Sequence, residues 1–333
     1  MGATNQRSHG LGLVWLLAML GLVLIAVASS LAAAEPQANL LIVGDWGFSP
    51  PATQNAAQRK VAQAMAQYVR QSQIAFHGVL VVGDNFRTRL VGPDDPQFQE
   101  AFERVYDPKD LAMPFYAVFG AHDYEYGADR AELAYARAHP ESRWKLPARW
   151  YRLDIPAAAP LVTVLMTDSD REWLGKDAWR AQLRWMEEEL GKPRSSLWTI
   201  CVSHHPLFSD GWHGDSLVLK AAWGPILKKH RVDFQISGHD HVLQHLELPG
   251  WTATFLTSGG GGEDTTRPLL GKRGPFIGAM HGFMVMQFTA RTARVSLIDD
   301  TGNALHLFER DRDGKIRVIG PAPEGKSSAG ASH

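Results

Sequence analysis

Five short apolar segments of the chain each end at an aspartate or a histidine, and this repetition restricts the folds that the sequence can adopt. The segments, each with the polar residues that follow it, are 40–43 with Asp45, 79–82 with Asp84, 115–119 with His122, 197–202 with His204, and 233–236 with His239 and His241. Short apolar runs bounded by turn-forming residues are typical of buried strands. One Gly-Asp pair is explained by the turn preference of both residues, but five such strand ends in order are not. Since the carboxyl ends of strands in an α/β sheet share one edge, we expect these side chains to converge.

Helical patterns separate several of the expected strands. Apolar residues within 61–69 and 179–190 recur at the spacing of one helix face. Alternating strands and helices indicate an α/β layered fold. After residue 236 the helical signal fades, and 253–256, 283–289, 293–298 and 304–308 are predicted to be consecutive strands. The second half of the chain is therefore expected to contribute strands to a second sheet.

Composition excludes some classes of protein. The chain has 333 residues, of which 45% are apolar and 21% charged, so it has ample material for a large core and is not disordered as a whole. Its formal net charge of -1 offers no bulk attraction to nucleic acid or to anionic lipid. We therefore expect no nucleic-acid partner, and any phosphate binding must come from a local site.

Residues 1–34 are predicted to be a targeting segment. Arg7 supplies a weakly basic start, 11–27 are apolar, and Ala32-Ala33-Ala34 provides small residues for cleavage. The apolar run also reaches the length of a membrane span, so the segment is either a cleaved signal peptide or an uncleaved N-terminal anchor. Both alternatives place the folded part outside the cytoplasm, in the periplasm or secreted. The folded domain is then expected over 35–310, followed by a C-terminal tail over 311–333 whose end is disordered.

The single cysteine, Cys201, excludes an intramolecular disulfide. It lies within the apolar run 197–202, so we interpret it as a small core residue and not as a catalytic thiol.

The residue types at the strand ends point to metal ions. Carboxylates and imidazoles together suit Zn, Fe, Mn or Ni, and this cluster exceeds what one ion needs. An aspartate can bridge two ions about 3.5–4 Å apart, and such a pair lowers the pKa of bound water and stabilises both oxygens of a phosphoryl transfer. Glycines precede Asp45, Asp84 and His239, where the backbone must turn sharply beside the ions.

These motifs resemble those of the calcineurin-like metallophosphoesterases, and in particular the small, tartrate-resistant type of purple acid phosphatase. The resemblance covers about 39–308 and extends through 96–100 and 149–153. The motifs that carry it are Gly44-Asp45-Trp46-Gly47, Gly83-Asp84-Asn85-Phe86, Ser203-His204-His205-Pro206 and Gly238-His239-Asp240-His241. It implies a four-layer αββα sandwich of two mixed β-sheets flanked by helices, with a dinuclear metal site at its edge.

The resemblance also implies a role for each motif residue. Asp45 and His241 would hold the first metal, and His204 and His239 the second. Asp84 would bridge the two ions. His122 would contact the phosphate or act as general acid, assisted by His213, because a histidine near its ordinary pKa can protonate a leaving group. We further assign Asn85 and Arg87 to substrate binding.

The chain departs from the family pattern at three positions. Arg87 stands where the family has the tyrosine whose phenolate binds ferric iron, and Ala121 stands where it has an asparagine ligand. Relatives without the tyrosine have a histidine at the position of Gly47. Each metal would keep three protein ligands, which is normal for a catalytic zinc. We therefore expect one or two divalent ions (Zn, Mn or Fe(II)) and no ferric–tyrosinate centre, since a guanidinium repels cations.

Arg87 has two interpretations at this point. It either forms a bidentate contact with the substrate phosphate or points to solvent.

The resulting hypotheses fall into three classes. The leading one is an exported, metal-dependent phosphoesterase that hydrolyses phosphate monoesters of small molecules, with a membrane partner only if the N-terminal segment stays uncleaved. The second is a non-catalytic homologue that keeps the scaffold and its phosphate- and metal-binding pocket, motivated by Arg87 and Ala121. The third is a phosphodiesterase.

Overall fold

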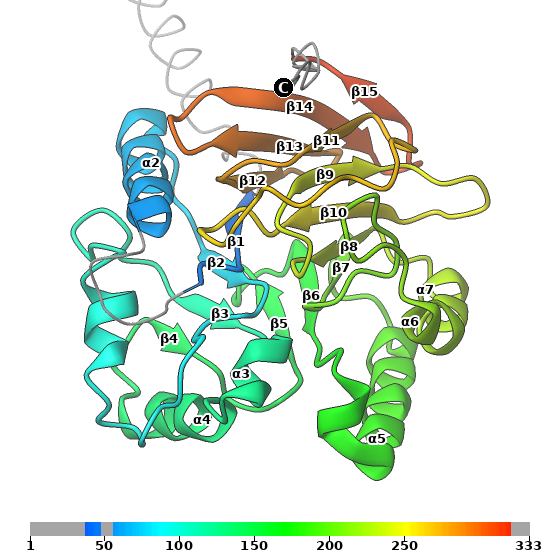
Figure 1. Ribbon diagram of the computed structural model, residues 1–333. Helices are drawn as coiled ribbons and strands as arrows, with labels where there is room; N and C mark the ends of the chain where they lie inside the picture. The colour runs from blue at the N-terminus through cyan, green and yellow to red at the C-terminus, as the bar shows by residue number, and fades with distance from the viewer. Residues whose placement is uncertain (1–36, 48–55, 321–333) are drawn as a thin grey trace, which may run out of the picture. The chain divides into compact units, whose positions relative to one another are not determined.

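The computed structural model describes residues 37–47 and 56–320, and the strands of this part form two sheets. The first sheet has eight strands in the order β15-β14-β13-β12-β1-β2-β3-β4 (Figure 1). Their bounds, in chain order, are β1 (Ala38–Val43), β2 (Gly78–Val81), β3 (Phe115–Ala117), β4 (Trp144–Lys145), β12 (Gly282–Phe288), β13 (Thr292–Asp299), β14 (Ala304–Asp311) and β15 (Ile316–Val318). The two predicted halves of the chain thus meet in one sheet, where β1 pairs antiparallel with β12.

The second sheet has seven strands in the order β11-β9-β10-β8-β7-β6-β5. Their bounds are β5 (Tyr151–Ile155), β6 (Val162–Met166), β7 (Trp198–Val202), β8 (Phe234–Ser237), β9 (Leu243–Leu246), β10 (Thr254–Ser258) and β11 (Phe276–Gly278). In both sheets the strands that alternate with helices pair in parallel, and the later hairpin-connected strands pair antiparallel. Both sheets are therefore mixed.

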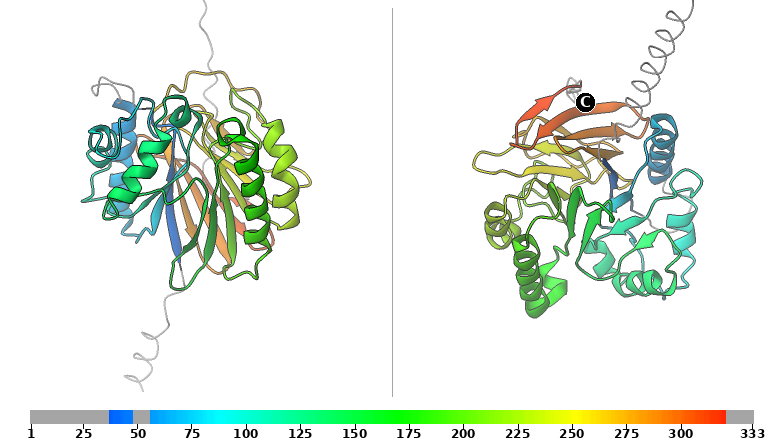
Figure 2. Two further views of the ribbon diagram at one scale, coloured as in Figure 1. Left: turned by 90° about the horizontal axis from the view of Figure 1, so that it is seen from below. Right: turned by 180° about the vertical axis from the view of Figure 1, so that it is seen from behind.

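Helices cover the outer side of each sheet. Seen from below, α2 to α4 lie beside the first sheet and α5 to α7 beside the second, with the two sheets between them (Figure 2). The helices are α2 (Ala56–Ser72), the π-helix η2 (Phe98–Glu103), α3 (Ala121–Glu125), α4 (Asp129–Ala138), α5 (Arg171–Gly191), α6 (Leu217–Ala222) and α7 (Gly224–Lys229). This arrangement confirms the expected αββα sandwich.

The central strands are buried on both faces. All six residues of β1 and all five of β7 are buried, because one face of each strand packs on the opposite sheet and the other on helices. Cys201 in β7 is fully buried, and burial raises the pKa of its thiol to about 12. The interpretation of Cys201 as a core residue is therefore confirmed.

The edges of the sheets differ from the sequence-based expectation. We predicted no strand at β4, β5, β9, β11 or β15, because these are short or carry polar residues. β15 also lies beyond residue 310, where the tail was expected to begin, and it pairs with β14. None of the helices in residues 37–47 and 56–320 is long and apolar enough to span a bilayer. The targeting segment over 1–34 and the end of the tail over 321–333 lie outside the described residues.

A buried histidine pair connects the two sheets and makes folding sensitive to acid. His306 in β14 is 1% exposed, and its Nε2 lies 2.9 Å from Nδ1 of His245 in β9. Burial, with a smaller contribution from the neighbouring His245, lowers the pKa of His306 from 6.5 to about 4. The unfolded chain therefore binds a proton between these two pH values that the folded chain does not.

We expect the free energy of unfolding to fall as the pH is lowered from 6.5 to 4, with His306 contributing up to about 3 kcal/mol of that loss. Urea unfolding of the metal-free protein at several pH values measures this. The substitution His306→Phe should make the pH dependence shallower, because it removes the buried imidazole. Equal pH dependence in the native protein and in His306→Phe would contradict the assignment.

Candidate metal centre

The side chains predicted to converge do lie together at one edge of the two sheets. Asp45 follows β1, Asp84 follows β2 and His204 follows β7, and one ligand atom of each lies within 4.8 Å of the others. The same limit holds for His204, His205 and His239. Two overlapping groups of three donors therefore share His204.

Asp84 lies at the middle of the cluster. Its Oδ1 is 3.4 Å from His204 Nε2 and accepts a hydrogen bond of 2.9 Å from the backbone N–H of His122. Its Oδ2 is 3.8 Å from His122 Nε2. A Cβ atom at Gly120 would lie 2.1 Å from Asp84 Oδ1, so only glycine fits beside this carboxylate. This central place suits a bridging carboxylate.

Asp45 and the residues after β8 form the other side of the cluster. His241 Nε2 lies 3.9 Å from Asp45 Oδ1, and the backbone N–H of His239 donates to Asp45 Oδ1 over 3.0 Å. A Cβ atom at Gly238 would lie 2.2 Å from Asp45 Oδ2. The glycine before His239 is thus needed for close approach, as the sequence indicated.

Hydrogen bonds to backbone carbonyls set the orientation of two imidazoles. His204 Nδ1 lies 2.9 Å from the carbonyl oxygen of Val82, and His241 Nδ1 lies 2.7 Å from that of Asp264. A carbonyl oxygen can only accept, so each Nδ1 carries the proton and donates it. In the neutral ring this leaves the Nε2 lone pair free, which is the arrangement found in metal-ligating histidines.

The backbone is strained at three of the cluster residues. Asp45, Asp84 and His239 have positive φ values of 55°, 52° and 69°, a region that residues other than glycine seldom occupy. Each such residue costs of order 1–3 kcal/mol, and they gather at functional sites. The cluster is therefore maintained at some cost to stability.

Burial and mutual repulsion shape the charges of the cluster. Burial, and then repulsion from Asp84, raises the pKa of Asp45 well above its usual range. Burial also raises the pKa of Asp84, but the charges of His204 and His122, the hydrogen bond from the His122 N–H and smaller contributions together outweigh it, so that the net shift is downward. Burial lowers the pKa of His204 and, with repulsion from neighbouring histidines, lowers that of His239 well below its usual range. Neutral imidazoles and closely spaced carboxylates fit a divalent cation, which would offset the carboxylate repulsion.

Arg87 does not point freely to solvent. Its Nη1 lies 2.6 Å from Oε2 of Glu263, whose side chain is only 8% exposed. Arg87 is also one of the residues that line a cavity beside Asp84, His239 and His241, which we call the central cavity. A Cβ atom at Gly47 would lie 2.3 Å from Glu263 Oε1, so the carboxylate fills the space beside Gly47. Sequence reasoning missed Glu263, although it directly follows the run of four glycines. The backbone there pairs with the β1 end, since the N–H of Glu263 donates to the Asp45 carbonyl over 2.9 Å.

The structure corrects the assignment of Asn85 to substrate binding. Asn85 is 0% exposed, and its side-chain nitrogen donates to the Val118 carbonyl, to Asp123 and to Glu132 over 3.0–3.1 Å. The amide therefore points into the protein, away from the cavity. Its neighbour Asp84 faces the cluster instead, because the chain turns sharply between them.

Asp123 holds two of the strand-end loops together, a role that the sequence did not reveal. It is fully buried and accepts backbone N–H groups of Gly120, Asn85 and Phe86 over 2.7, 2.9 and 2.9 Å. Burial, and then the charge of Asp84, raises the pKa of Asp123 well above its usual range. The loop after β2 is thus fastened to the start of α3, where His122 lies.

The central cavity has a volume of about 230 Å³ and is lined by both predicted proton donors, His122 and His213. His122 Nδ1 lies 2.7 Å from Glu125 Oε2, and His213 Nδ1 lies 3.0 Å from Asp240 Oδ1. Ala121 lines the cavity without a polar atom in its side chain. Two histidines, each beside a carboxylate, therefore face the same space as Asp84, Arg87, His239 and His241.

His205 is a further imidazole that the sequence did not single out. Its Nδ1 lies 2.9 Å from Ser169 Oγ, and burial, with repulsion from His204, lowers its pKa to about 3. It contributes to the second donor group, so a neutral His205 is an additional candidate ligand.

Comparison with known proteins identifies the family of the chain. The model of the calcineurin-like phosphoesterase family matches residues 38–243. Purple acid phosphatase 4 from Arabidopsis thaliana is 31% identical over 82% of this chain and 84% of its own length, and tartrate-resistant acid phosphatase type 5 from Sus scrofa is 28% identical over 82% and 86%. The solved structures include GAP50, the anchor in the inner membrane complex of Plasmodium (TM-score 0.68, 21% identity, 81% of this chain and 87% of that one). They also include purple acid phosphatase PPD1 from yellow lupin seeds (TM-score 0.64, 14% identity, 84% of this chain and 55% of that one). The chain therefore belongs to the calcineurin-like phosphoesterase family, and its homologues are purple acid phosphatases, including the tartrate-resistant type 5 proteins.

Proposed function

We propose that the protein is an exported, metal-dependent phosphoesterase that hydrolyses phosphate monoesters of small molecules. The observation that carries this proposal is the cluster of Asp45, Asp84 and His204, next to a cavity that is lined by Asp84, His239 and His241 and that also presents two histidines beside carboxylates. Export follows from the predicted targeting segment in the sequence.

The ligand set that we propose is the one implied by the resemblance. Asp45 and His241 would hold one ion, His204 and His239 the other, and Asp84 would contact both. When bound, Zn, Mn or Fe(II) at this place lowers the pKa of a bound water and stabilises charge on the phosphate oxygens. The Arg87 guanidinium beside the first position disfavours a trivalent ion.

The other side chains of the cavity bind the substrate phosphate and protonate the leaving group. Arg87, held by Glu263, donates to the phosphate oxygens from the cavity wall. His122 and His213 supply protons to the leaving-group oxygen, and their contacts with Glu125 and Asp240 orient the two rings.

Metal analysis of the purified protein beside hydrolysis assays tests this proposal. Phenyl phosphate as monoester and bis(p-nitrophenyl) phosphate as diester are assayed with and without added divalent ions, from acid to neutral pH. We expect bound metal and metal-dependent turnover of the monoester. Absence of both contradicts the proposal, and preference for the diester would favour a phosphodiesterase.

A second candidate function is a non-catalytic homologue. It is favoured by the Arg87–Glu263 ion pair, which stands where the family has a metal-binding phenolate, and by the apolar Ala121. The cavity would then bind an anion or a metal without turnover.

The double substitution Arg87→Tyr with Ala121→Asn is expected to tighten divalent-ion binding at least about tenfold, because it adds a phenolate and an amide oxygen as ligands. It should also allow ferric iron to bind with a visible absorption band that the native protein lacks. Calorimetry and absorption spectroscopy measure the two effects. Adding Glu263→Gln controls for the carboxylate that loses its arginine partner. Unchanged metal affinity in both variants would show that positions 87 and 121 do not face the ions.

A further inference from the structure

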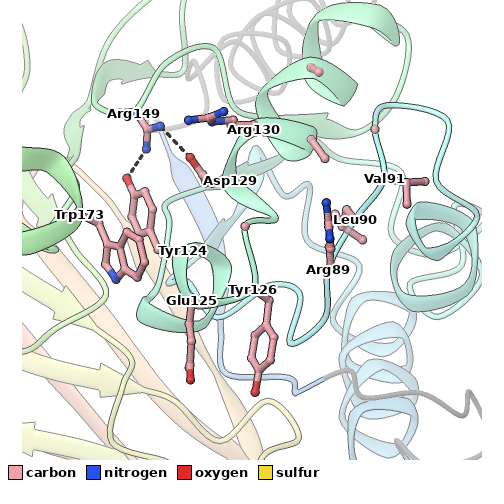
Figure 3. A pocket seen from close by; sticks show the side chains of 14 residues that line it. Arg89, Leu90, Val91, Tyr124, Glu125, Tyr126, Asp129, Arg130, Arg149 and Trp173 are labelled. Carbon is pink, nitrogen blue, oxygen red and sulfur yellow. Dashed lines mark hydrogen bonds and ion pairs between the residues drawn. The ribbon is translucent and has the colours of Figure 1, made fainter.

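A cavity of about 780 Å³ lies beside the metal centre and has no role in the chemistry described so far. It is formed by the loop that follows Phe86, by α3 and α4, and by the start of α5 (Figure 3). It is more than large enough for a drug-sized ligand.

Three arginines line the cavity, and two of them pair with no other residue in the part of the chain that the structure describes. Arg89, Arg130 and Arg149 line it together with two acids, Glu125 and Asp129. Arg149 already forms an ion pair, since its Nη2 lies 2.7 Å from Asp129 Oδ2. Within residues 37–47 and 56–320, the side chains of Arg89 and Arg130 have no ion-pair or hydrogen-bond partner. Two positive charges are therefore available to an anionic group.

The same cavity exposes aromatic surface. Trp173 is 57% exposed and stacks on Tyr124, with ring centroids 5.9 Å apart and an interplanar angle of 6°. Tyr126 is 39% exposed. Figure 3 shows Trp173 and Tyr124 on one side of the cavity and Arg89 on the other. Exposed tryptophan supported by a buried ring offers a stacking surface for a planar group.

Short stretches of chain connect this cavity to the metal centre. Arg87 lines the central cavity and Arg89, two residues later, lines this one. His122 lines the central cavity, and its partner Glu125 lines the neighbouring one, with 2.7 Å between Nδ1 and Oε2. The Cα atoms of Arg87 and Arg89 are at most about 7 Å apart, because the two residues are only two positions apart along the chain, so the two cavities adjoin along this stretch.

We propose that this cavity binds the leaving group of the substrate, and that the preferred substrates are phosphate monoesters whose leaving group carries an aromatic ring and a second anionic group. The ring would stack against Trp173, and the second anion would contact Arg89 and Arg130. This inference rests on the proposed function, because it assigns the cavity to a part of the phosphoesterase substrate. An aryl phosphate with a carboxylate has this chemistry. A nucleoside diphosphate has a leaving group of the same kind, a nucleoside monophosphate, although an anhydride bond and not an ester bond holds its terminal phosphate.

A matched substrate series tests the inference. Phenyl phosphate has a leaving group with the aromatic ring alone, and 3-phosphoglycerate has one with the second anionic group alone. The leaving group of 4-carboxyphenyl phosphate has both features. Adenosine diphosphate tests whether a nucleotide is accepted as well. We expect kcat/KM for 4-carboxyphenyl phosphate to exceed that for phenyl phosphate at least about tenfold, since a charge-assisted contact is of that order. The double variant Arg89→Gln with Arg130→Gln should remove this advantage and leave phenyl phosphate turnover unchanged. If adenosine diphosphate is hydrolysed and the double variant loses this activity too, the second anionic group that the cavity accepts includes the phosphate of a nucleotide.

The control variant is Arg137→Gln, an exposed arginine two turns further along α4 that does not line the cavity. It should keep the full preference. Equal kcat/KM for the two aryl phosphates in the native protein would overturn the inference while leaving the proposed function intact. If neither aryl phosphate is hydrolysed, the proposed function fails. Calorimetric comparison of phenylphosphonate with 4-carboxyphenylphosphonate then tests separately whether the cavity binds the second anionic group. Tighter binding of the carboxylated phosphonate, lost in the double variant, supports it, and equal binding contradicts it.

Discussion

Replacing Asp84 by asparagine is expected to abolish the binding of divalent ions at this centre and to lower phosphate-monoester hydrolysis at least about 100-fold. Removing a residue that only supports a metal ligand lowers metal affinity or activity about 10–100-fold. Asp84 lies within one donor group with Asp45 and His204, and we propose that it contacts both ions, so its loss should have a larger effect. Metal content after dialysis and kcat/KM with phenyl phosphate measure the loss.

The same substitution should destabilise the metal-free protein only modestly. Asparagine tolerates the left-handed backbone at this residue, where φ is 52°. It removes the charge that, after burial, contributes to the raised pKa of Asp45, but it also removes the carboxylate whose own pKa the fold lowers. Thermal unfolding in chelator should therefore give a folded protein with a somewhat lower midpoint. Asp300→Asn, at a surface carboxylate 3.0 Å from Lys60, is the matched control and should change neither property. Metal binding by Asp84→Asn equal to that of the native protein would contradict the proposal that Asp84 is a metal ligand.

Replacing Asp123 by alanine is expected to lower the free energy of unfolding by about 2–5 kcal/mol, because three buried backbone N–H groups lose their acceptor. The loss is less than three separate penalties, since burial already disfavours the charged carboxylate. Urea unfolding, read as a shift in midpoint at constant slope, measures it.

Activity should fall together with stability in Asp123→Ala, because the N–H of Gly120 and the loop after Asp84 are no longer tied to one group. Asp123→Asn keeps one acceptor oxygen and should lose less stability than the alanine variant. An alanine variant as stable as the native protein would show that water or other groups satisfy these N–H donors.

Much of the fold could be predicted because its central strands are buried on both faces. Such strands are continuous apolar runs, as in β1 and β7, and they are visible in the sequence whatever covers them. The peripheral strands are different. β4 has two residues, β9 carries Gln244 and His245 among its four, and β15 has partly exposed side chains. Their strand conformation depends on pairing with the neighbouring strand, so no local sequence pattern predicts it.

The candidate site could be predicted where a side chain follows a buried strand, since strand ends share an edge. It could not be predicted where the role of a residue depends on the direction of its side chain or on a partner far away in the sequence. Asn85 follows Asp84 directly, yet its amide points into the protein toward Glu132. Arg87 pairs with Glu263, which is 176 residues away in the chain. Spacing alone carries no information about either contact.

The most direct test of the metal centre is a calorimetric titration of the chelator-treated protein with Mn²⁺ or Zn²⁺. If Asp45, Asp84, His204, His239 and His241 form a working ligand set despite Arg87 and Ala121, one or two ions per chain will bind saturably, and Asp84→Asn will bind none. Binding that is absent, or that is the same in the native protein and in Asp84→Asn, would contradict a metal centre at this edge of the sheets.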